Sequence, residues 1–349
     1  MSIKKEHIGI LLIATAMLLN ACSSDDPGAQ TVTTVNEPVG KEVRLVSYTS
    51  PFTDKELSHR AAPTGFTAYT PDKRTNMGIY MLLTEDWANP QEKRITYSDR
   101  WHAYFDVTAD KTYTVYGYMP KTEGMSSSLT KSTDNAATLT ITGIKPITTD
   151  DICIITGVKD TDEGLKEGQF SWYSPVGVEN YLIHILMDHL YASVRFSMKV
   201  DAEYALLRTI KLKSMTLSTY KESVDATVTL THNTTGASPI SGVTYTASGS
   251  SDAVVIFNSD EGTALDKTTP LAIDACFAPT LSGNLTLVST YDVYDRYGNL
   301  IRKDCSATNM IPDLEASRGQ RVQLNLTVNP TYLYVLSDPD LDSPTVVVN

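Results

Sequence analysis

Residues 194–200 read VRFSMKV, and this stretch decides the fold class. Val194, Phe196, Met198 and Val200 point to one side of an extended chain, while the polar residues between them point to the other side. An apolar residue at every second position is the pattern of a β-strand with one buried face and one wet face. We therefore expect a strand here, with its apolar face on a protein core.

Similar short runs follow on both sides of this stretch. Residues 210–213 alternate in the same way, and the apolar phase then slips to Met215 and Leu217, which indicates a β-bulge. Residues 285–301 form two runs around a Gly298-Asn299 pair, which is typical of a β-hairpin. Further apolar runs lie at residues 41–48, 77–83, 101–107, 112–118, 138–142 and 151–155. Short strands with Gly, Pro, Asn and Asp between them predict an all-β chain of antiparallel sandwiches or barrels.

The chain has 349 residues, enough for about two domains of ordinary size. We expect an N-terminal β-sandwich over residues 41–182 and a C-terminal β-sandwich over residues 183–330. Residues 183–190, next to this boundary, fit either a short helix or the start of a strand. Residues 22–40 are polar, contain proline and glycine, and show no periodicity, so they are expected to form a flexible linker.

The N-terminus has the features of a signal peptide. Two lysines precede an apolar run from Ile8 to Leu19, which is too short to span a bilayer. The following residues, Leu19-Asn20-Ala21-Cys22, resemble the lipobox of bacterial lipoproteins, although Asn20 is more polar than the usual residue at its position. This resemblance implies that residues 1–21 are removed and that Cys22 is acylated. Several acyl chains on Cys22 would hold the protein on the cell outer membrane, because each buried CH₂ contributes about 0.8 kcal/mol.

The charge and the polar residues exclude several classes of function. The net charge is −12 and no basic run occurs, which argues against nucleic acid as a partner. The histidines lack metal-ligand spacing, and the nucleophile elbow, the phosphate loop and the dinucleotide motif are all missing. Asp338, Asp340 and Asp342 imitate the start of a calcium loop, but position six is not glycine and prolines interrupt it. We therefore expect a protein that is not an enzyme and has no cofactor or metal.

Three cysteines follow Cys22: Cys153, Cys276 and Cys305. They contain no Cys-x-x-Cys pair and no zinc spacing. A Cys276–Cys305 disulfide and buried free thiols both remain open.

The C-terminal tail, residues 331–349, is unusual because it is apolar. Two β-forming runs are joined by an acidic hinge that contains proline. An apolar strand without a partner promotes association unless something receives it. The candidate residues of a donor strand are Tyr332, Tyr334, Leu336, Val346, Val347 and Val348.

Several pieces of the chain, in their order and spacing, resemble the fimbrillins, which are fimbrial subunits exported as lipoproteins by certain Gram-negative bacteria. The resemblance covers nearly the whole length. It is carried by the lipobox and by residues 111–118, KTYTVYGY; 189–196, HLYASVRF; 207–212, LRTIKL; and 319–326, GQRVQLNL.

The resemblance implies two tandem transthyretin-like β-sandwich domains and a mode of assembly. In this family a protease cuts after an arginine in the loop that follows the first strand. The first strand leaves, and the C-terminal strand of the next subunit fills the groove by strand addition. Such head-to-tail contacts produce a filament rather than a closed ring.

In this chain the arginine that matches is Arg60. It is preferred over Arg44, which lies inside the first strand, and over Arg74, which comes later. The expected partners are other fimbrial subunits, the outer membrane through the lipid anchor, and host or bacterial surface ligands in adhesion. Two alternatives remain: an anchor subunit that keeps its first strand, and a monomeric surface lipoprotein that binds glycan or host protein. The second predicts that the tail folds onto its own domain and that exposed aromatic residues, such as Trp87, Trp101 or Trp172, cluster on one face.

Overall fold

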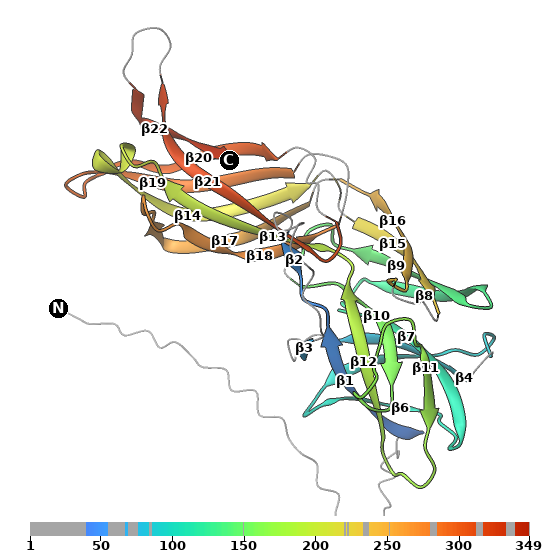
Figure 1. Ribbon diagram of the computed structural model, residues 1–349. Helices are drawn as coiled ribbons and strands as arrows, with labels where there is room; N and C mark the ends of the chain where they lie inside the picture. Colours follow the sequence, from blue (N-terminus) through green and yellow to red (C-terminus); the bar gives the residue numbers. More distant parts are fainter. Residues whose placement is uncertain are drawn as a thin grey trace, which may run out of the picture. The chain divides into compact units, whose positions relative to one another are not determined.

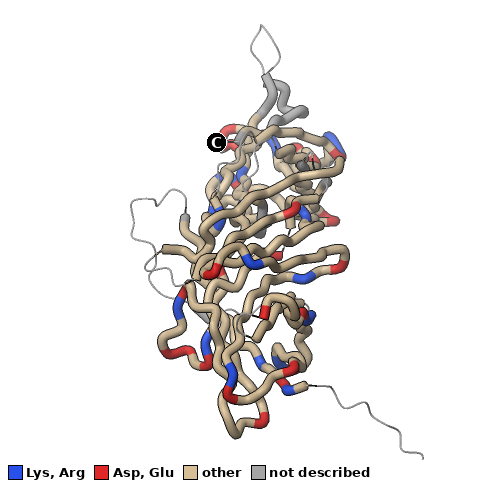
Figure 2. The backbone as a smooth tube through the Cα atoms, turned by 90° about the vertical axis from the view of Figure 1, so that its right-hand side faces the viewer, with Lys and Arg blue, Asp and Glu red and all other residues tan. Residues whose placement is uncertain are grey.

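The computed structural model describes residues 40–54, 67–68, 76–83, 86–148, 150–219, 221, 223–232, 237–250, 252–279, 285–311, 317–332 and 339–348. These residues form β-strands and one short 3₁₀ helix, η2 (Tyr204–Leu206), so the expected all-β class is confirmed (Figure 1). Within the described ranges, no helix has the length and apolar character needed to cross a membrane. Acidic and basic residues lie interspersed along the described strands and turns (Figure 2).

Seven strands form a closed, barrel-like ring. They are β1 (Lys41–Thr49), β4 (Met77–Leu83), β5 (Gln91–Tyr97), β6 (Trp101–Phe105), β7 (Lys111–Met119), β10 (Cys153–Lys159) and β12 (Tyr181–His189). The order of neighbours is β10-β12-β1-β6-β5-β4-β7, and β7 pairs back with β10. Two further strands attach to this ring: β3 (Thr67–Ala68) pairs with β1, and β11 (Ser171–Ser174) pairs with β7.

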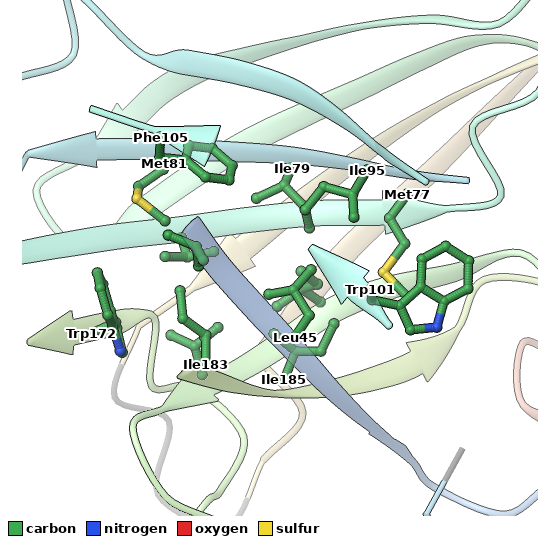
Figure 3. Packing of buried hydrophobic residues seen from close by; sticks show 14 of the residues in the cluster. Leu45, Met77, Ile79, Met81, Ile95, Trp101, Phe105, Trp172, Ile183 and Ile185 are labelled. Atoms are coloured by element: carbon green, nitrogen blue, oxygen red, sulfur yellow. The ribbon is translucent and has the colours of Figure 1, made fainter. Parts of the chain in front are cut away.

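Apolar side chains from all seven strands fill the ring (Figure 3). Leu45, Ile79, Phe105 and Ile183 are among them, and each is at most 5% exposed. Three of the ring strands, β4, β7 and β10, are buried on both faces over most of their length. This explains why residues 77–83 form an unbroken apolar run and do not alternate.

A four-stranded sheet covers the outside of β4, β7 and β10. It consists of β8 (Ser126–Thr133), β9 (Ala136–Ile144), β15 (Ser223–Thr231) and β16 (Ile240–Ser248), in the order β16-β15-β9-β8. Its core includes Tyr80 and Tyr116 from the ring, with Leu139 from β9 and Val228 from β15. The sheet therefore joins strands from both sides of the boundary expected at residues 182 and 183. The domain limits 41–182 and 183–330 stay a prediction.

The remaining strands form a two-sheet sandwich. One sheet has the order β18-β13-β21-β2, with β22 also on β21, and the other has the order β17-β14-β19-β20. The strands are β2 (Thr53–Asp54), β13 (Ala192–Val200), β14 (Arg208–Thr219), β17 (Asp252–Ala264), β18 (Leu271–Ala278), β19 (Leu285–Asp295), β20 (Leu300–Ile311), β21 (Gln320–Tyr332) and β22 (Pro339–Val348). Their facing apolar side chains form a single core cluster, which includes Val194, Phe196, Leu217 and Leu287.

The local predictions in this sandwich are confirmed. Val194, Phe196, Met198 and Val200 are buried on β13, between exposed or half-exposed polar residues. The phase slip in β14 is a bulge: pairing with both β17 and β19 shifts between Leu212 and Ser214. The Gly298-Asn299 pair lies in the turn between β19 and β20, where Gly298 has φ +86°.

Two expectations are changed by the structure. Residues 183–190, left open between helix and strand, belong mostly to strand β12. The sheets are not purely antiparallel, because β1 pairs in parallel with β12, and β13 and β2 pair in parallel with β21. Sequence periodicity cannot reveal strand direction, since the alternation of side chains is the same in both arrangements.

Candidate functional site

Strand β1 has a partner on each side in the ring. It is parallel to β12, from Val43 opposite Tyr181 to Thr49 opposite Met187. It is antiparallel to β6, from Lys41 opposite Phe105 to Leu45 opposite Trp101. If β1 were absent, the edges of β6 and β12 would lose these partners and the ring would be open between them.

The side chains of β1 alternate between the ring core and the surface. Val43, Leu45, Ser47 and Thr49 are buried. On the other face, Val46 is 38% exposed. An inserted strand would therefore need apolar or small residues at every second position to replace β1.

The chain can enter the ring before β1 because residue 40 is glycine. Gly40 has φ +115°, and a Cβ at this position would lie 2.5 Å from the carbonyl oxygen of Phe105. A larger residue would collide with β6, so glycine is required by both conformation and space.

Charged groups surround the beginning of β1. The Glu42 carboxylate accepts hydrogen bonds from Arg100 Nη2 at 2.8 Å and from Arg44 Nη2 at 3.2 Å. Burial alone would raise the pKa of Glu42, but the hydrogen bonds and charges of Arg100 and Arg44 together lower it below its usual value. These contacts connect β1 to the turn before β6 through Arg100.

The chain leaves β1 through residues 50–54, which lead from the ring to the sandwich. The Thr53 amide donates to the Gly319 carbonyl at 2.9 Å, and β2 pairs with the beginning of β21. The ring of Phe52 stacks on the ring of His189, with a centroid distance of 3.7 Å and an interplanar angle of 22°. This segment is therefore attached to both parts of the fold.

Asp151, Cys153 and His189 form a buried polar cluster beside this segment. His189 Nδ1 lies 2.7 Å from Asp151 Oδ2, and Cys153 Sγ donates to the same oxygen at 3.3 Å. Two ligands bound at about 2.0 Å to one tetrahedral ion would lie about 3.3 Å apart. The 2.7 Å separation is a hydrogen-bond distance, so we assign a hydrogen-bonded cluster rather than a metal centre.

The C-terminal tail pairs with its own domain. β22 is antiparallel to β21, with Val346 opposite Val328 and Val348 opposite Leu326. Val346 is buried at 2% exposure in the sandwich core, and its carbonyl accepts a hydrogen bond from Asn309 Nδ2 on β20. Val347 is half-buried, on the other side of the strand.

The other predicted tail residues are only partly described. Tyr332 is the last residue of β21, where its backbone pairs with Pro339. Tyr334 and Leu336 lie outside the described residues. Two further predicted sites, Cys22 and Arg60, also lie outside them, so acylation at Cys22 and cleavage at Arg60 stay predictions.

The cysteines and tryptophans bear on two of the open alternatives. Cys305 is a free cysteine, so the Cys276–Cys305 disulfide is not formed. Trp101 and Trp172 are buried in the ring core, at 6% and 1% exposure. They cannot form the exposed tryptophan face that the lipoprotein alternative predicted.

No protein-family model and no curated protein matches this chain. Among solved structures it is similar to a fimbrial protein from Bacteroides vulgatus, with 14% identity, a TM-score of 0.38, and coverage of 89% of this chain and 98% of that one. A putative cell adhesion protein from Bacteroides fragilis has 10% identity and a TM-score of 0.42, covering 88% of this chain and 97% of that one.

A third similar structure is a fimbrial anchor protein from Porphyromonas gingivalis. It has 12% identity and a TM-score of 0.30, and the match covers 87% of this chain and 95% of that one. The solved structures named here are thus those of fimbrial proteins and of a putative cell adhesion protein.

Proposed function

We propose that this protein is a structural subunit of a cell-surface fimbria that supports adhesion. It is exported as a lipoprotein, held on the outer membrane through Cys22, and joined head-to-tail to other subunits by strand donation. The plan of two transthyretin-like sandwich domains belongs to the same proposal, as does proteolytic removal of the first strand after Arg60.

The observation that carries this proposal is the position of β1. It is the first described strand, it is paired along both edges, and it lies in a ring whose core it helps to fill. Its removal would expose two strand edges and an apolar slot at the same time. Both are costly in water, and an incoming strand with alternating apolar residues would satisfy both.

The tail offers a strand with alternating apolar residues. Its pairing with β21 of the same chain determines what must happen before it can be donated to another subunit. Val346 and Val348 fall on alternate positions, as Val43 and Leu45 do in β1. Since β22 now pairs with β21 of the same chain, it would have to leave that position before it could enter another subunit. Self-pairing would thus keep an unprocessed subunit from associating early.

The same self-pairing favours a second candidate function. A fimbrial anchor subunit that keeps β1, or a monomeric surface lipoprotein that binds glycan or host protein, would also hold its tail on its own sandwich. In both of these cases β1 stays in the ring permanently and no filament grows from the slot.

The decisive experiment measures molecular mass by size-exclusion chromatography with light scattering. The protein would start at residue 22 and carry Cys22→Ser, and it would be measured before and after limited trypsin treatment, with the cleavage position read by mass spectrometry. The fimbrial-subunit proposal predicts a ladder of oligomers after cleavage at Arg60. The ladder should be absent in Arg60→Gln, and absent in a chain that ends at Tyr332. A monomer that loses β1 without forming oligomers would refute strand donation, and a chain that resists cleavage at Arg60 would favour the anchor reading.

A further inference from the structure

His189 is buried between two groups that accept hydrogen bonds. Its Nδ1 lies 2.7 Å from Asp151 Oδ2, and its Nε2 lies 2.8 Å from the carbonyl oxygen of Ser50. The His189 side chain is 4% exposed. A backbone carbonyl can only accept, and an ionised carboxylate can only accept. Both ring nitrogens can donate only if the ring is protonated, since a neutral ring carries one N–H.

A neutral ring could keep both contacts only if Asp151 carried the proton instead. In that case the proton is shared by the His189–Asp151 pair, and the pair still holds one proton more than a neutral histidine beside an ionised aspartate. The geometry therefore requires one extra proton at this site in either arrangement.

The groups that face the site come from several elements. The Cys153 thiol on β10 donates to Asp151 Oδ2. Burial, and after it the negative charge of Asp151, raise the pKa of this thiol well above its usual value, so the thiol is neutral. Asp188, next to His189 on β12, accepts from Arg318 Nη1. Glu167, near Asp188, has its pKa raised mainly by burial. Burial alone would lower the pKa of His189, but Asp151, the Ser50 carbonyl and Asp188 together raise it above 6.5.

The protonated site holds the segment that follows β1. Ser50 is the first residue after β1, and its carbonyl is one of the two acceptors. Phe52 lies flat on the His189 ring, and Thr53 is tied to Gly319. Loss of the proton would either leave the Ser50 carbonyl without a donor from His189, or turn the Nδ1 lone pair toward the Asp151 carboxylate, whose remaining donor is the Cys153 thiol. Either outcome is unfavourable in a buried place, so the contact would open.

We propose that the His189–Asp151 pair is a pH-dependent latch on residues 50–53, closed when the pair is protonated and open when it is not. The pKa of the pair is higher in the closed state than when its side chains are exposed to water. The latch therefore contributes its full stability below about pH 6.5, the usual pKa of histidine, and loses it as the pH rises through the raised pKa. The inference does not depend on the proposed function, because it concerns β1 in place whether or not a protease later removes it.

Hydrogen exchange measured by mass spectrometry on the full chain tests this latch. Exchange of the peptide that contains residues 50–53 would be followed from pH 5 to pH 9 and corrected for the intrinsic exchange rate. The opening constant should rise about tenfold for each unit by which the pKa of the closed pair exceeds that of the open pair. In His189→Gln the exchange of this segment should lose the pH dependence, because glutamine does not titrate. The matched control is His184→Gln, since His184 contacts Tyr48 of β1 from outside the ring; it should retain the wild-type pH profile.

A second measurement keeps the inference testable if His189→Gln does not fold. In wild-type protein labelled with ¹⁵N-histidine, the ring nitrogens of His189 should show the shifts of a protonated ring at pH 6.5 or should titrate together with Asp151 above that pH. A ring that is neutral at pH 6.5 beside an ionised Asp151 would overturn the latch. So would exchange of residues 50–53 that does not change with pH after correction.

Discussion

The burial of Val346 predicts that β22 contributes to the stability of its own sandwich. A tail that only touched the surface of the sandwich would not do so. Val346→Ala removes two methyl-sized groups from a side chain that is 2% exposed in the sandwich core. At about 0.8 kcal/mol for each group, the lost transfer free energy is about 1.6 kcal/mol. A cavity term is added to this, but among the described strands β22 pairs with β21 alone and can shift inward, so we expect a total near 2 kcal/mol.

The matched control is the next residue of the same strand. Val347 has the same side chain and the same strand propensity, but it is half-buried and is not part of the core cluster. Val347→Ala should therefore lower the free energy of unfolding by less than about 1 kcal/mol.

The assay is urea unfolding of both variants, followed by circular dichroism, with the free-energy change taken from the transition of the sandwich. Tryptophan fluorescence would not report on the sandwich, because the three tryptophans, Trp87, Trp101 and Trp172, all lie outside its core. Equal and small losses for Val346→Ala and Val347→Ala would refute the seating of β22 described above.

Three further predictions concern the ring. Leu45→Ala should cost about 2–5 kcal/mol in urea unfolding, while Val46→Ala, on the outer face of the same strand, should cost less than about 1 kcal/mol; equal costs would contradict the orientation of β1. Gly117→Ala should cost about 1–3 kcal/mol, because its new Cβ would collide with the Gly78 carbonyl oxygen. A Cβ at Gly242 meets nothing within 4 Å, so Gly242→Ala should leave the urea midpoint nearly unchanged. Glu42→Gln should lower the urea midpoint at pH 7, and the effect should shrink as the pH falls below the usual carboxyl pKa, because a lowered pKa stabilises the fold only while the carboxylate is ionised. An effect as large at pH 3 as at pH 7 would argue against the charge of Glu42 as its cause.

Local features of the fold could be predicted from sequence because they depend on neighbouring residues. The alternation at residues 194–200, the bulge before Met215 and the hairpin at Gly298 each arise from a period or a turn that a few residues define. The closure of the ring could not be predicted in this way. Pairing of β7 with β10 and of β1 with β12 depends on strands that are far apart in the chain.

The polar cluster at the exit of β1 was missed for the same reason. Asp151 and His189 are separated by 38 positions, and Ser50 and His189 by 139, so no motif spacing connects them. The sequence did contain a weaker sign: His189 directly precedes the apolar residues Leu190 and Tyr191, and a polar side chain buried beside such residues needs a partner. That sign could have marked His189 as a residue with a specific role, but it could not have identified the partner.

The place of β1 in the ring also has a consequence for biosynthesis. β1 is the first of the ring strands to leave the ribosome, yet its contact from Tyr48 to His184 on β12 spans 136 positions. The covering sheet waits longer still, because it needs β15 and β16. Folding in order from the N-terminus, which is common for successive domains, is thus not available to the ring. Until a little more than half of the chain has been made, β1 can pair with β6 but lacks β12, its partner on the other edge, and such long-range pairing is slow and prone to aggregation. During synthesis, the edge of β1 that later pairs with β12 is therefore open to pairing with other strands until β12 has been made.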